Sequence, residues 1–109
     1  RSAGARVACR TAGALGARAV FALAFPLHPP GKPEKSRLPE LLDAGVPTRV
    51  VQGERDPFGG PAEFPADVDV VPVPYADHGF AVAKSAPPDD AQTAATITAA
   101  AVEWLAGLR

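Results

Sequence analysis

The sequence predicts an α/β fold in which about three parallel strands are covered by helices. Two observations predict it. The strand-like segments are short and apolar on both faces, and they alternate with helix-like segments. The chain has 109 residues, 47% of them hydrophobic and 21% charged, which is typical of one globular unit and not of a disordered chain.

Charge and cysteine content exclude several classes of protein. Eleven basic and 12 acidic residues give a net charge of −1 without a basic stripe, so we expect no nucleic-acid partner. The one cysteine, Cys9, cannot form an internal disulfide, and we expect it to be a buried, inert thiol. No apolar run approaches the roughly 20 residues that cross a bilayer, and no leader-like segment is present. We therefore expect a cytoplasmic protein with no membrane partner.

The first elements are a helix and a strand. Residues 2–15 are rich in small side chains, and Gly13 and Gly16 supply a helix end. Residues 19–25 form an unbroken apolar run that ends at Pro26, which is typical of a buried parallel strand. The apolar residues at helical spacing in the first segment are Val7, Ala8, Ala12 and Leu15.

A long polar excursion separates this strand from the next. Residues 28–39 are broken by prolines and predict no regular element. Residues 38–44 predict a short helix that ends at Gly45. Residues 48–53 then predict a second strand.

The last part of the chain predicts a third strand and a long helix. A turn-rich segment, 54–60, follows the second strand, and residues 68–73 predict the third strand. After a loop at 74–80, residues 89–108 predict a helix with acidic residues at its positive end. Its expected buried face consists of Ala94, Ile97, Ala101, Leu105 and Leu108.

Three candidate catalytic residues stand where loops follow strands, the region in which parallel sheets gather their chemistry: Ser2, Asp56 and His78. Taken singly, they are consistent with a surface serine, a turn and a structural histidine. Together they occur in one of the chain orders known for Ser-Asp-His triads. The segment RSAG also matches the last part of the G-x-S-x-G elbow, in which a serine sits on a sharp turn before a helix.

Four segments carry a resemblance to a known family: RSAGARVA, FPLHPPGKPEKSR, VVQGERDPFG and DHGF. In these segments the chain resembles the α/β-hydrolase superfamily, in its dienelactone-hydrolase-like and testis-expressed/NSL-complex-subunit-like branch. The resemblance covers essentially the whole chain. It implies that residues 1–109 are the C-terminal portion of a single domain, beginning at the nucleophile elbow.

The resemblance also implies a chemistry, namely hydrolysis of an ester or related acyl bond in a small molecule. Ser2 would attack the acyl carbonyl, His78 would act as base and Asp56 would orient the imidazole. The backbone N–H of Ala3 would be one oxyanion donor. The second donor belongs to a loop that precedes this segment in the family, so we expect the 109-residue chain to be inactive alone. A non-catalytic binding or scaffold module of the same fold is the alternative.

Other residues complete the expected site. Phe58 and Phe80 are candidates to contact substrate, and His28 could contact substrate or pin the excursion. Asp77 competes with Asp56 as the acid, but side chains of adjacent residues rarely face each other, which favours Asp56 as the partner of His78. No metal-ligand spacing or phosphate loop appears, so we expect neither metal nor cofactor. The sequence leaves the substrate and the oligomeric state open.

Overall fold

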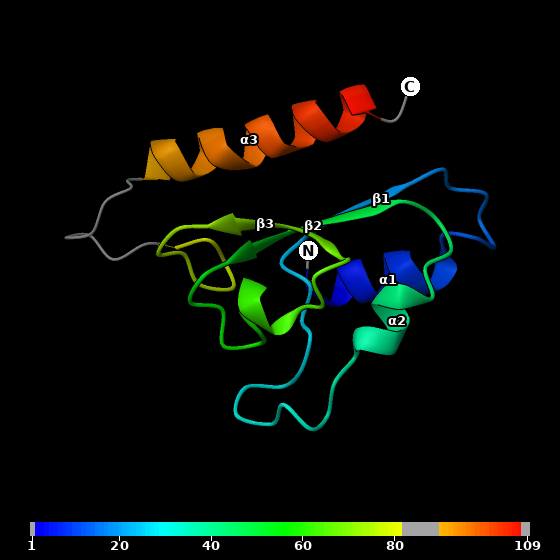
Figure 1. Cartoon of the computed structure of the whole chain (residues 1–109), viewed down its shortest axis with the longest axis horizontal. Helices are drawn as coiled ribbons and strands as arrows, with labels where there is room; N and C mark the ends of the chain where they lie inside the picture. The colour runs from blue at the N-terminus through cyan, green and yellow to red at the C-terminus, as the bar shows by residue number, and fades with distance from the viewer. Residues whose placement is uncertain (1, 82–89, 108–109) are drawn as a thin grey trace.

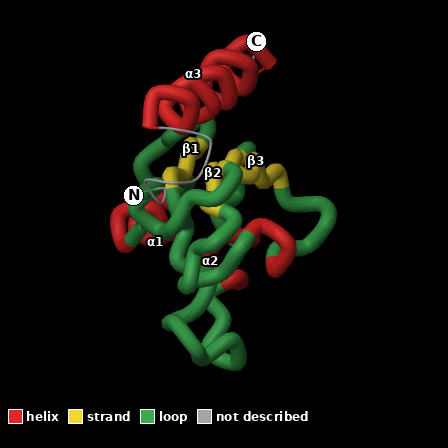
Figure 2. Tube along the Cα trace, turned by 90° about the vertical axis from the view of Figure 1, so that its left-hand side faces the viewer, coloured by secondary structure: helices red, strands yellow, loops and turns green. Residues whose placement is uncertain are grey.

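The computed structural model describes residues 2–81 and 90–107, which form three layers (Figure 1). A parallel three-stranded sheet lies in the middle; α3 covers one face, and α1 and α2 lie on the other (Figures 1 and 2). This confirms the predicted α/β class. The elements are α1 (Ala3–Thr11), β1 (Val20–Leu23), α2 (Leu38–Leu42), β2 (Thr48–Gly53), the 3₁₀ turn η1 (Pro61–Glu63), β3 (Asp69–Val73) and α3 (Asp90–Gly107).

The sheet has the order β1-β2-β3, with both pairs parallel. The strands therefore point the same way, and their carboxyl ends meet at one edge. The central strand β2 is buried on both faces, since Val50 and Val51 are each 0% exposed. This burial explains why β2 lacks an alternating pattern.

The strand predictions agree closely with the structure. The prediction for β2 is confirmed at both ends, and β3 begins one residue later than expected. The first strand is shorter than 19–25 because Ala24, directly after Leu23, has a φ of 60° and so leaves the extended conformation.

Of the four apolar residues at helical spacing in the first segment, Ala12 is buried and Ala8 packs against the core, but Val7 and Leu15 do not face the sheet. Val7 is 46% exposed and Leu15 is 79% exposed, and the helix ends at Thr11. The turn at Ser2, whose carbonyl accepts the N–H groups of Ala5 and Arg6, sets the rotation of this short helix. Small side chains then allow it to approach the sheet closely. The residues it buries, including the one just after its end, are Ala5, Cys9 and Ala12.

The buried face of α3 lies about one residue away from the face that the sequence predicts. Ile97 packs against the sheet as expected, but Leu105 is 59% exposed and Ala94 is exposed. Trp104 lies against Phe21 of β1, with their ring centroids 5.5 Å apart, and this large ring decides which side faces inward. Thr93 and Ala100 are accordingly buried. Two predicted positions, Asp89 and Leu108, lie outside the described residues.

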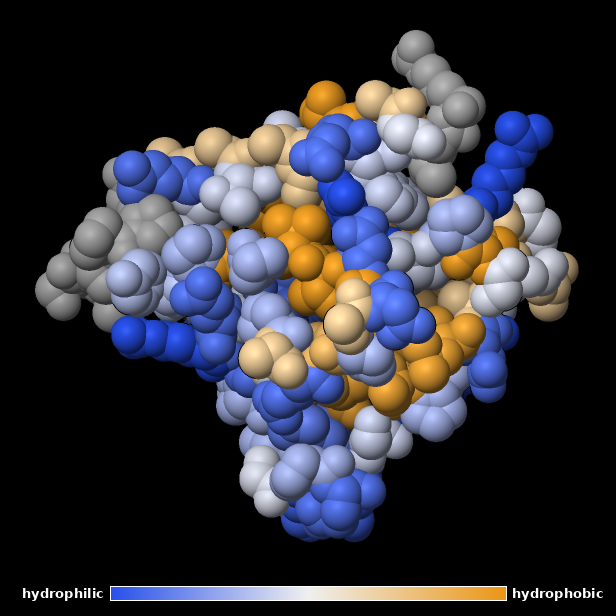
Figure 3. Space-filling view, viewed as in Figure 1, coloured by the Kyte–Doolittle hydropathy of each residue, from blue (hydrophilic) through white to orange (hydrophobic). Residues whose placement is uncertain are grey.

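Apolar side chains form one cluster on each face of the sheet. The cluster on the α3 face is small, with Val51, Val73, Ala76 and Ala100 buried in it. Figure 3 shows further apolar side chains at the surface just below α3. The cluster on the other face is larger and contains the buried residues Ala5, Cys9, Ala12, Val20, Ala22, Phe25, Leu27, Leu41, Ala44, Val50 and Phe64. In the described parts of the chain, no helix combines the length and apolar character needed to span a membrane.

Candidate active site

The structure brings Ser2, Asp56 and His78 together from three loops. Asp56 follows β2 and His78 follows β3, at the edge where the strands end. Ser2 reaches the same edge because its N–H donates to the carbonyls of Leu23 (3.3 Å) and Ala24 (3.0 Å) at the end of β1. Side chains 76 positions apart in the sequence thereby come into contact.

The three side chains form an unbroken hydrogen-bonded chain. His78 Nε2 lies 2.8 Å from Ser2 Oγ, and His78 Nδ1 lies 2.7 Å from Asp56 Oδ2. In the neutral imidazole, Nδ1–H donates to the carboxylate and Nε2 accepts from the hydroxyl. The Asp56 side chain is 0% exposed, whereas 19% of the His78 side chain is exposed. This arrangement can move the hydroxyl proton to the imidazole.

The backbone at Ser2 presents its hydroxyl outward from the helix. Its φ of 50° and ψ of −118° are unusual for a residue with a side chain and cost about 1–3 kcal/mol. Ser2 occupies the N-cap position of α1, where a serine hydroxyl usually accepts an N–H of the first turn. Here the hydroxyl makes no cap hydrogen bond and meets His78 instead.

Ala3 is the first residue of α1 and is exposed. Its N–H belongs to the first turn, whose amides have no acceptor within the helix. The Ser2 carbonyl accepts from the amides of Ala5 (2.9 Å) and Arg6 (3.3 Å), so the turn around Ser2 is well fixed. An N–H directly after the serine can therefore be offered to a developing oxyanion.

Two further groups hold the Asp56 carboxylate. Oδ1 accepts the N–H of Phe58 at 2.8 Å, and Oδ2 accepts Nε2 of Gln52 at 3.0 Å beside His78. Gln52 is 0% exposed, and sequence reasoning missed it. The available signal was an amide directly after the apolar pair Val50 and Val51 in a strand expected to be central, because a buried polar group needs partners.

The acid loop, residues 54–60, and the histidine loop, residues 74–80, meet directly at Gly53. A Cβ there would overlap the carbonyl oxygens of Ala76 and Asp77, so only glycine permits this approach. Across the same junction, the N–H of Arg55 donates to Ala76 O at 2.8 Å. The two loops are thus fixed to each other through their backbones.

Asp77 shapes the turn that carries the histidine. Its Oδ1 accepts the N–H groups of Gly79 and Ala81, each at 2.9 Å. Asp56, not Asp77, is the carboxylate that meets the imidazole. The structure therefore separates the two candidate acids by their contacts.

The candidates for substrate contact lie in different surroundings. The ring of Phe58 lies against that of His78, with centroids 4.3 Å apart and planes inclined by 32°. Phe80 is partly buried and packs against the apolar cluster on the α3 face.

His28 is 6% exposed and both of its ring nitrogens have acceptors. Nδ1 lies 2.8 Å from Pro29 O and Nε2 lies 2.7 Å from Glu63 Oε1. Both bonds are made only by the doubly protonated ring. The Pro29 carbonyl first, and then Glu63, raise the pKa of His28, while the bond from His28 lowers the pKa of Glu63. The pair ties the excursion after β1 to η1.

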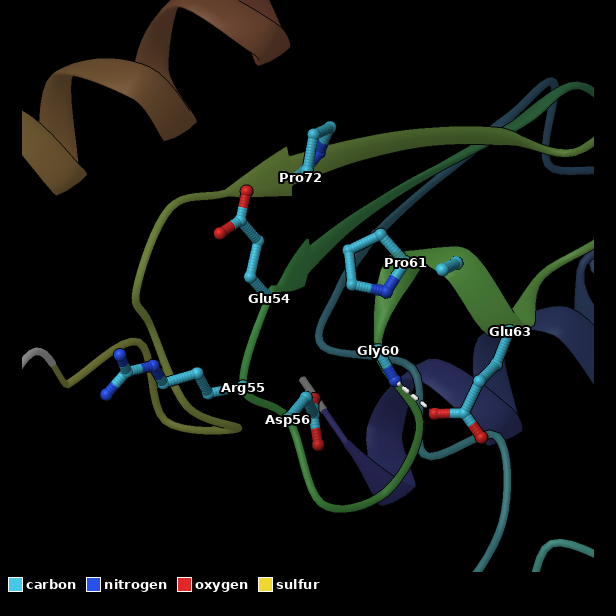
Figure 4. Close-up of a pocket in the computed structure, with 8 residues that line it drawn as sticks. Glu54, Arg55, Asp56, Gly60, Pro61, Glu63 and Pro72 are labelled. Carbon is cyan, nitrogen blue, oxygen red and sulfur yellow. Dashed lines mark hydrogen bonds between the residues drawn. The ribbon is translucent and has the colours of Figure 1, made fainter.

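A pocket of about 620 Å³ adjoins the acid loop (Figure 4). It includes Asp56 but neither Ser2 nor His78, so it lies beside the hydrogen-bonded chain and is not centred on it. Glu63 on its wall accepts the N–H of Gly60 at 2.7 Å. The lining residues are Glu54, Arg55, Asp56, Gly60, Pro61, Ala62, Glu63 and Pro72.

Neither the thiol of Cys9 nor a cluster of acidic side chains forms a second reactive centre among the described residues. Cys9 is 1% exposed, and burial, followed by the charge of Glu40, raises the pKa of its thiol. A high pKa disfavours the reactive thiolate. Among residues 2–81 and 90–107, no group of three or more His, Cys, Asp or Glu side chains could hold a metal ion.

Comparisons with known proteins agree with this architecture. Residues 1–106 match the family described as "Alpha/beta hydrolase domain". No curated protein and no solved structure matches the sequence. Because the family match extends over nearly the whole chain, and the chain has the parallel sheet with flanking helices, it belongs to the α/β-hydrolase domain family.

Proposed function

We propose that this chain carries the catalytic residues of a serine hydrolase that cleaves an ester or related acyl bond of a small molecule. The observation that carries the proposal is the hydrogen-bonded chain from Ser2 through His78 to the buried Asp56. A structural role alone would require neither the strained backbone of Ser2 nor a hydroxyl turned away from its helix cap.

The chemistry proceeds in two steps. Ser2 Oγ attacks the acyl carbonyl while His78 Nε2 takes its proton, and the imidazolium then protonates the departing alcohol. A water molecule, deprotonated by the same imidazole, next attacks the acyl-serine. The bond between the acyl carbon and Ser2 Oγ then breaks, the carboxylic acid leaves, and the imidazolium returns its proton to Ser2 Oγ. Asp56 orients the imidazole and stabilises its cationic form, and the Ala3 N–H donates to the oxyanion.

We further assign the chain to the dienelactone-hydrolase-like branch of the superfamily. The segments VVQGERDPFG and DHGF support this assignment, because they hold the acid and the histidine of the proposed triad at their observed spacing. Phe58 and Phe80 are proposed to contact the substrate. For His28, two hydrogen bonds in a buried setting favour pinning the excursion over touching substrate.

The test is reaction with a fluorophosphonate probe, which modifies activated serines. The second oxyanion donor of the family lies in a loop that precedes this segment, so the test uses a version of the protein extended upstream to include that loop. We expect the probe to label Ser2 in this extended protein, as mapped by peptide mass spectrometry, whereas the 109-residue chain alone should show no appreciable esterase activity. Ser2→Ala should abolish labelling, and His78→Ala should slow it about 10³-fold or more, since the base is lost.

A matched control is Ser36→Ala, because Ser36 is an exposed serine whose hydroxyl caps the backbone at Leu38 (3.1 Å). This variant should label like the wild type. Labelling that persists in Ser2→Ala would refute the triad. A folded extended protein that does not react at all would instead favour a non-catalytic binding module.

A further inference from the structure

We infer that Gln52 is a positioning residue for the proposed hydrolase: its buried amide fixes the Asp56 carboxylate for His78 and holds the acid loop against the chain after β1. The inference rests on the proposed function for its catalytic meaning. Its structural content, the placement of Asp56 and His78, can be measured independently of any reaction.

Gln52 makes four hydrogen bonds although its side chain is 0% exposed. Nε2 donates to Phe25 O (2.9 Å), Asp56 Oδ2 (3.0 Å) and Gly59 O (2.7 Å), and Oε1 accepts the N–H of Phe25 (2.9 Å). Three acceptors surround the NH₂ group and a donor faces the carbonyl oxygen, so the orientation of the amide is fixed. Because NH₂ has two hydrogens for three acceptors, one hydrogen is shared.

The bond to Asp56 acts on the oxygen that also holds the imidazole. Oδ2 accepts from both Gln52 and His78, while Oδ1 accepts from Phe58 N–H. Three donors thus fix a fully buried carboxylate in one rotamer. Without Gln52, this carboxylate would lose one donor where water does not reach it, and it would be freer to turn away from His78.

Gln52 also fixes the backbone that carries Phe58. Its bond to Gly59 O joins the acid loop to the backbone of Phe25, which is itself 0% exposed. Gly59 has a φ of 124°, and a Cβ there would lie 2.8 Å from Leu27 Cβ, so the loop already lies close against the chain after β1. One amide therefore sets both the carboxylate and the ring that packs on His78.

The charged groups around Asp56 have other partners. His28 and Glu63 pair with each other, and Asp77 accepts N–H groups of its own turn. Arg55 is exposed and lies over the ring of Tyr75 at 5.5 Å. Substituting Gln52 by a neutral residue therefore frees Asp56 without changing any charge nearby.

The experiment compares Gln52→Met with Arg49→Met in the upstream-extended protein that is used for the labelling test. Arg49 is a matched control, because it lies on the same strand and also makes polar ties, to Asp69 (2.8 Å) and Ala100 O (2.9 Å), but away from Asp56. We expect Gln52→Met to slow fluorophosphonate labelling of Ser2 by about 10–100-fold, the effect typical of misplaced catalytic groups. Arg49→Met should leave the labelling rate unchanged.

A double-mutant cycle distinguishes positioning from a general structural role. If Gln52 acts through the Asp56 carboxylate, Gln52→Met should slow labelling by less than about threefold in an Asp56→Asn background. An equal factor in both backgrounds would overturn the inference. So would a Gln52→Met variant that labels at the wild-type rate, although the proposed hydrolase would then stand.

Proton NMR gives a readout that needs no reaction. The hydrogen bond from His78 Nδ1 to Asp56 should produce a low-field proton signal that is absent in His78→Ala. We expect Gln52→Met to lose this signal and Arg49→Met to keep it. If the wild type does not react with the probe, the proposed function fails, and the NMR comparison alone decides the role of Gln52.

Gln52→Glu replaces Gln52→Met if the methionine variant does not fold. It keeps the size of the side chain and the Oε1 acceptor, but it turns an oxygen toward three acceptors. We expect it to lose both rapid labelling and the low-field signal. Wild-type behaviour in both measurements would overturn the inference.

Discussion

The two faces of the sheet differ in what holds them. On the face of α1 and α2, eleven buried residues form one cluster that includes Phe25. Among the described residues, the apolar cluster on the α3 face contains four buried residues, and two of these are alanines. Ser2 and Asp56 are fixed from the side of the large cluster, since Ser2 begins α1 and Gln52 links Asp56 to Phe25. The comparison shows that Ser2 and Asp56 are held by the larger of the two apolar clusters, on the face of α1 and α2.

The largest expected effect on the free energy of unfolding comes from Val50 and Val51, two neighbours in β2 that face opposite sides of the sheet. Val50 and Val51 are both 0% exposed, but Val50 lies in the large cluster and Val51 in the small one. Val50→Ala should lower the free energy of unfolding by about 2–3 kcal/mol, because its close-packed neighbours cannot fill the cavity. Val51→Ala should cost about 1–2 kcal/mol, because α3 can settle toward the sheet.

Urea unfolding of the two variants, followed by circular dichroism, measures this difference. The exposed Val102 of α3 supplies the control, since Val102→Ala removes the same atoms from a residue that is 62% exposed. It should change stability by less than about 0.5 kcal/mol. Equal losses of unfolding free energy for Val50→Ala and Val51→Ala would contradict the expected difference in packing between the two faces of the sheet.

A smaller effect is expected at the ion pair of His28 and Glu63. The ordinary pKa values of Glu63 and His28 are 4.5 and 6.5, and between these two pH values both groups are charged. In this range His28→Asn should destabilise the protein by about 1 kcal/mol, a modest value because the Glu63 side chain is 47% exposed and solvent screens the pair. Because folding raises the pKa of His28, its contribution is complete below 6.5 and is lost as the pH rises through the folded value. Because folding lowers the pKa of Glu63, its contribution is present above 4.5 and is lost as the pH falls through the folded value.

The measurement is the stability difference between wild type and His28→Asn as a function of pH. The difference should narrow as the pH rises well above 6.5, when the imidazole of the wild type loses its proton. Glu63→Gln should show the same narrowing, since it removes the other partner. A difference that stays constant with pH would show that His28 contributes only by packing.

The smallest effect concerns the contact between α1 and α2. Arg6 makes two hydrogen bonds to Glu40, at 2.7 and 2.8 Å, and these bonds lower the pKa of Glu40. Glu40→Gln should destabilise the protein by about 0.5–1 kcal/mol above pH 4.5, and this loss should fade as the pH falls through the lowered pKa.

Thermal unfolding compares Glu40→Gln with Glu34→Gln, which neutralises an exposed carboxylate in the excursion. Only Glu40→Gln should lower the melting temperature measurably. A larger loss from Glu34→Gln would mean that net charge, and not the contact between the helices, governs the effect.

The strands could be predicted because their signal is local. In β2, the β-branched residues of the segment 48–53 and the turn-rich segment that follows it predicted both ends correctly. The fold class followed from the same signal, since buried strands separated by helices favour a parallel sheet. The positions of Ser2, Asp56 and His78 followed from chain order and from the loops in which they occur.

Helix faces and the support of the site could not be predicted in the same way. In alanine-rich helices hydrophobicity varies little around the axis. The helical spacing therefore included the exposed Val7 and Leu15 beside the buried Ala12, and it left out Ala5 and Cys9. In α3, the ring of Trp104 against Phe21 outweighs the smaller apolar residues. The role of Gln52 could not be predicted, because it depends on hydrogen bonds to Phe25 and Gly59 that form only in the folded chain.

The long stretch of sequence between Ser2 and His78 affects the order of events in folding. Their contact closes a loop of 76 positions, and such closures are entropically costly until the intervening strands have paired. The hydroxyl and the imidazole therefore meet late, after β1, β2 and β3 have assembled. During refolding, we expect the contact between Ser2 and His78 to form near the end of the process, whereas helix formation reports only its beginning.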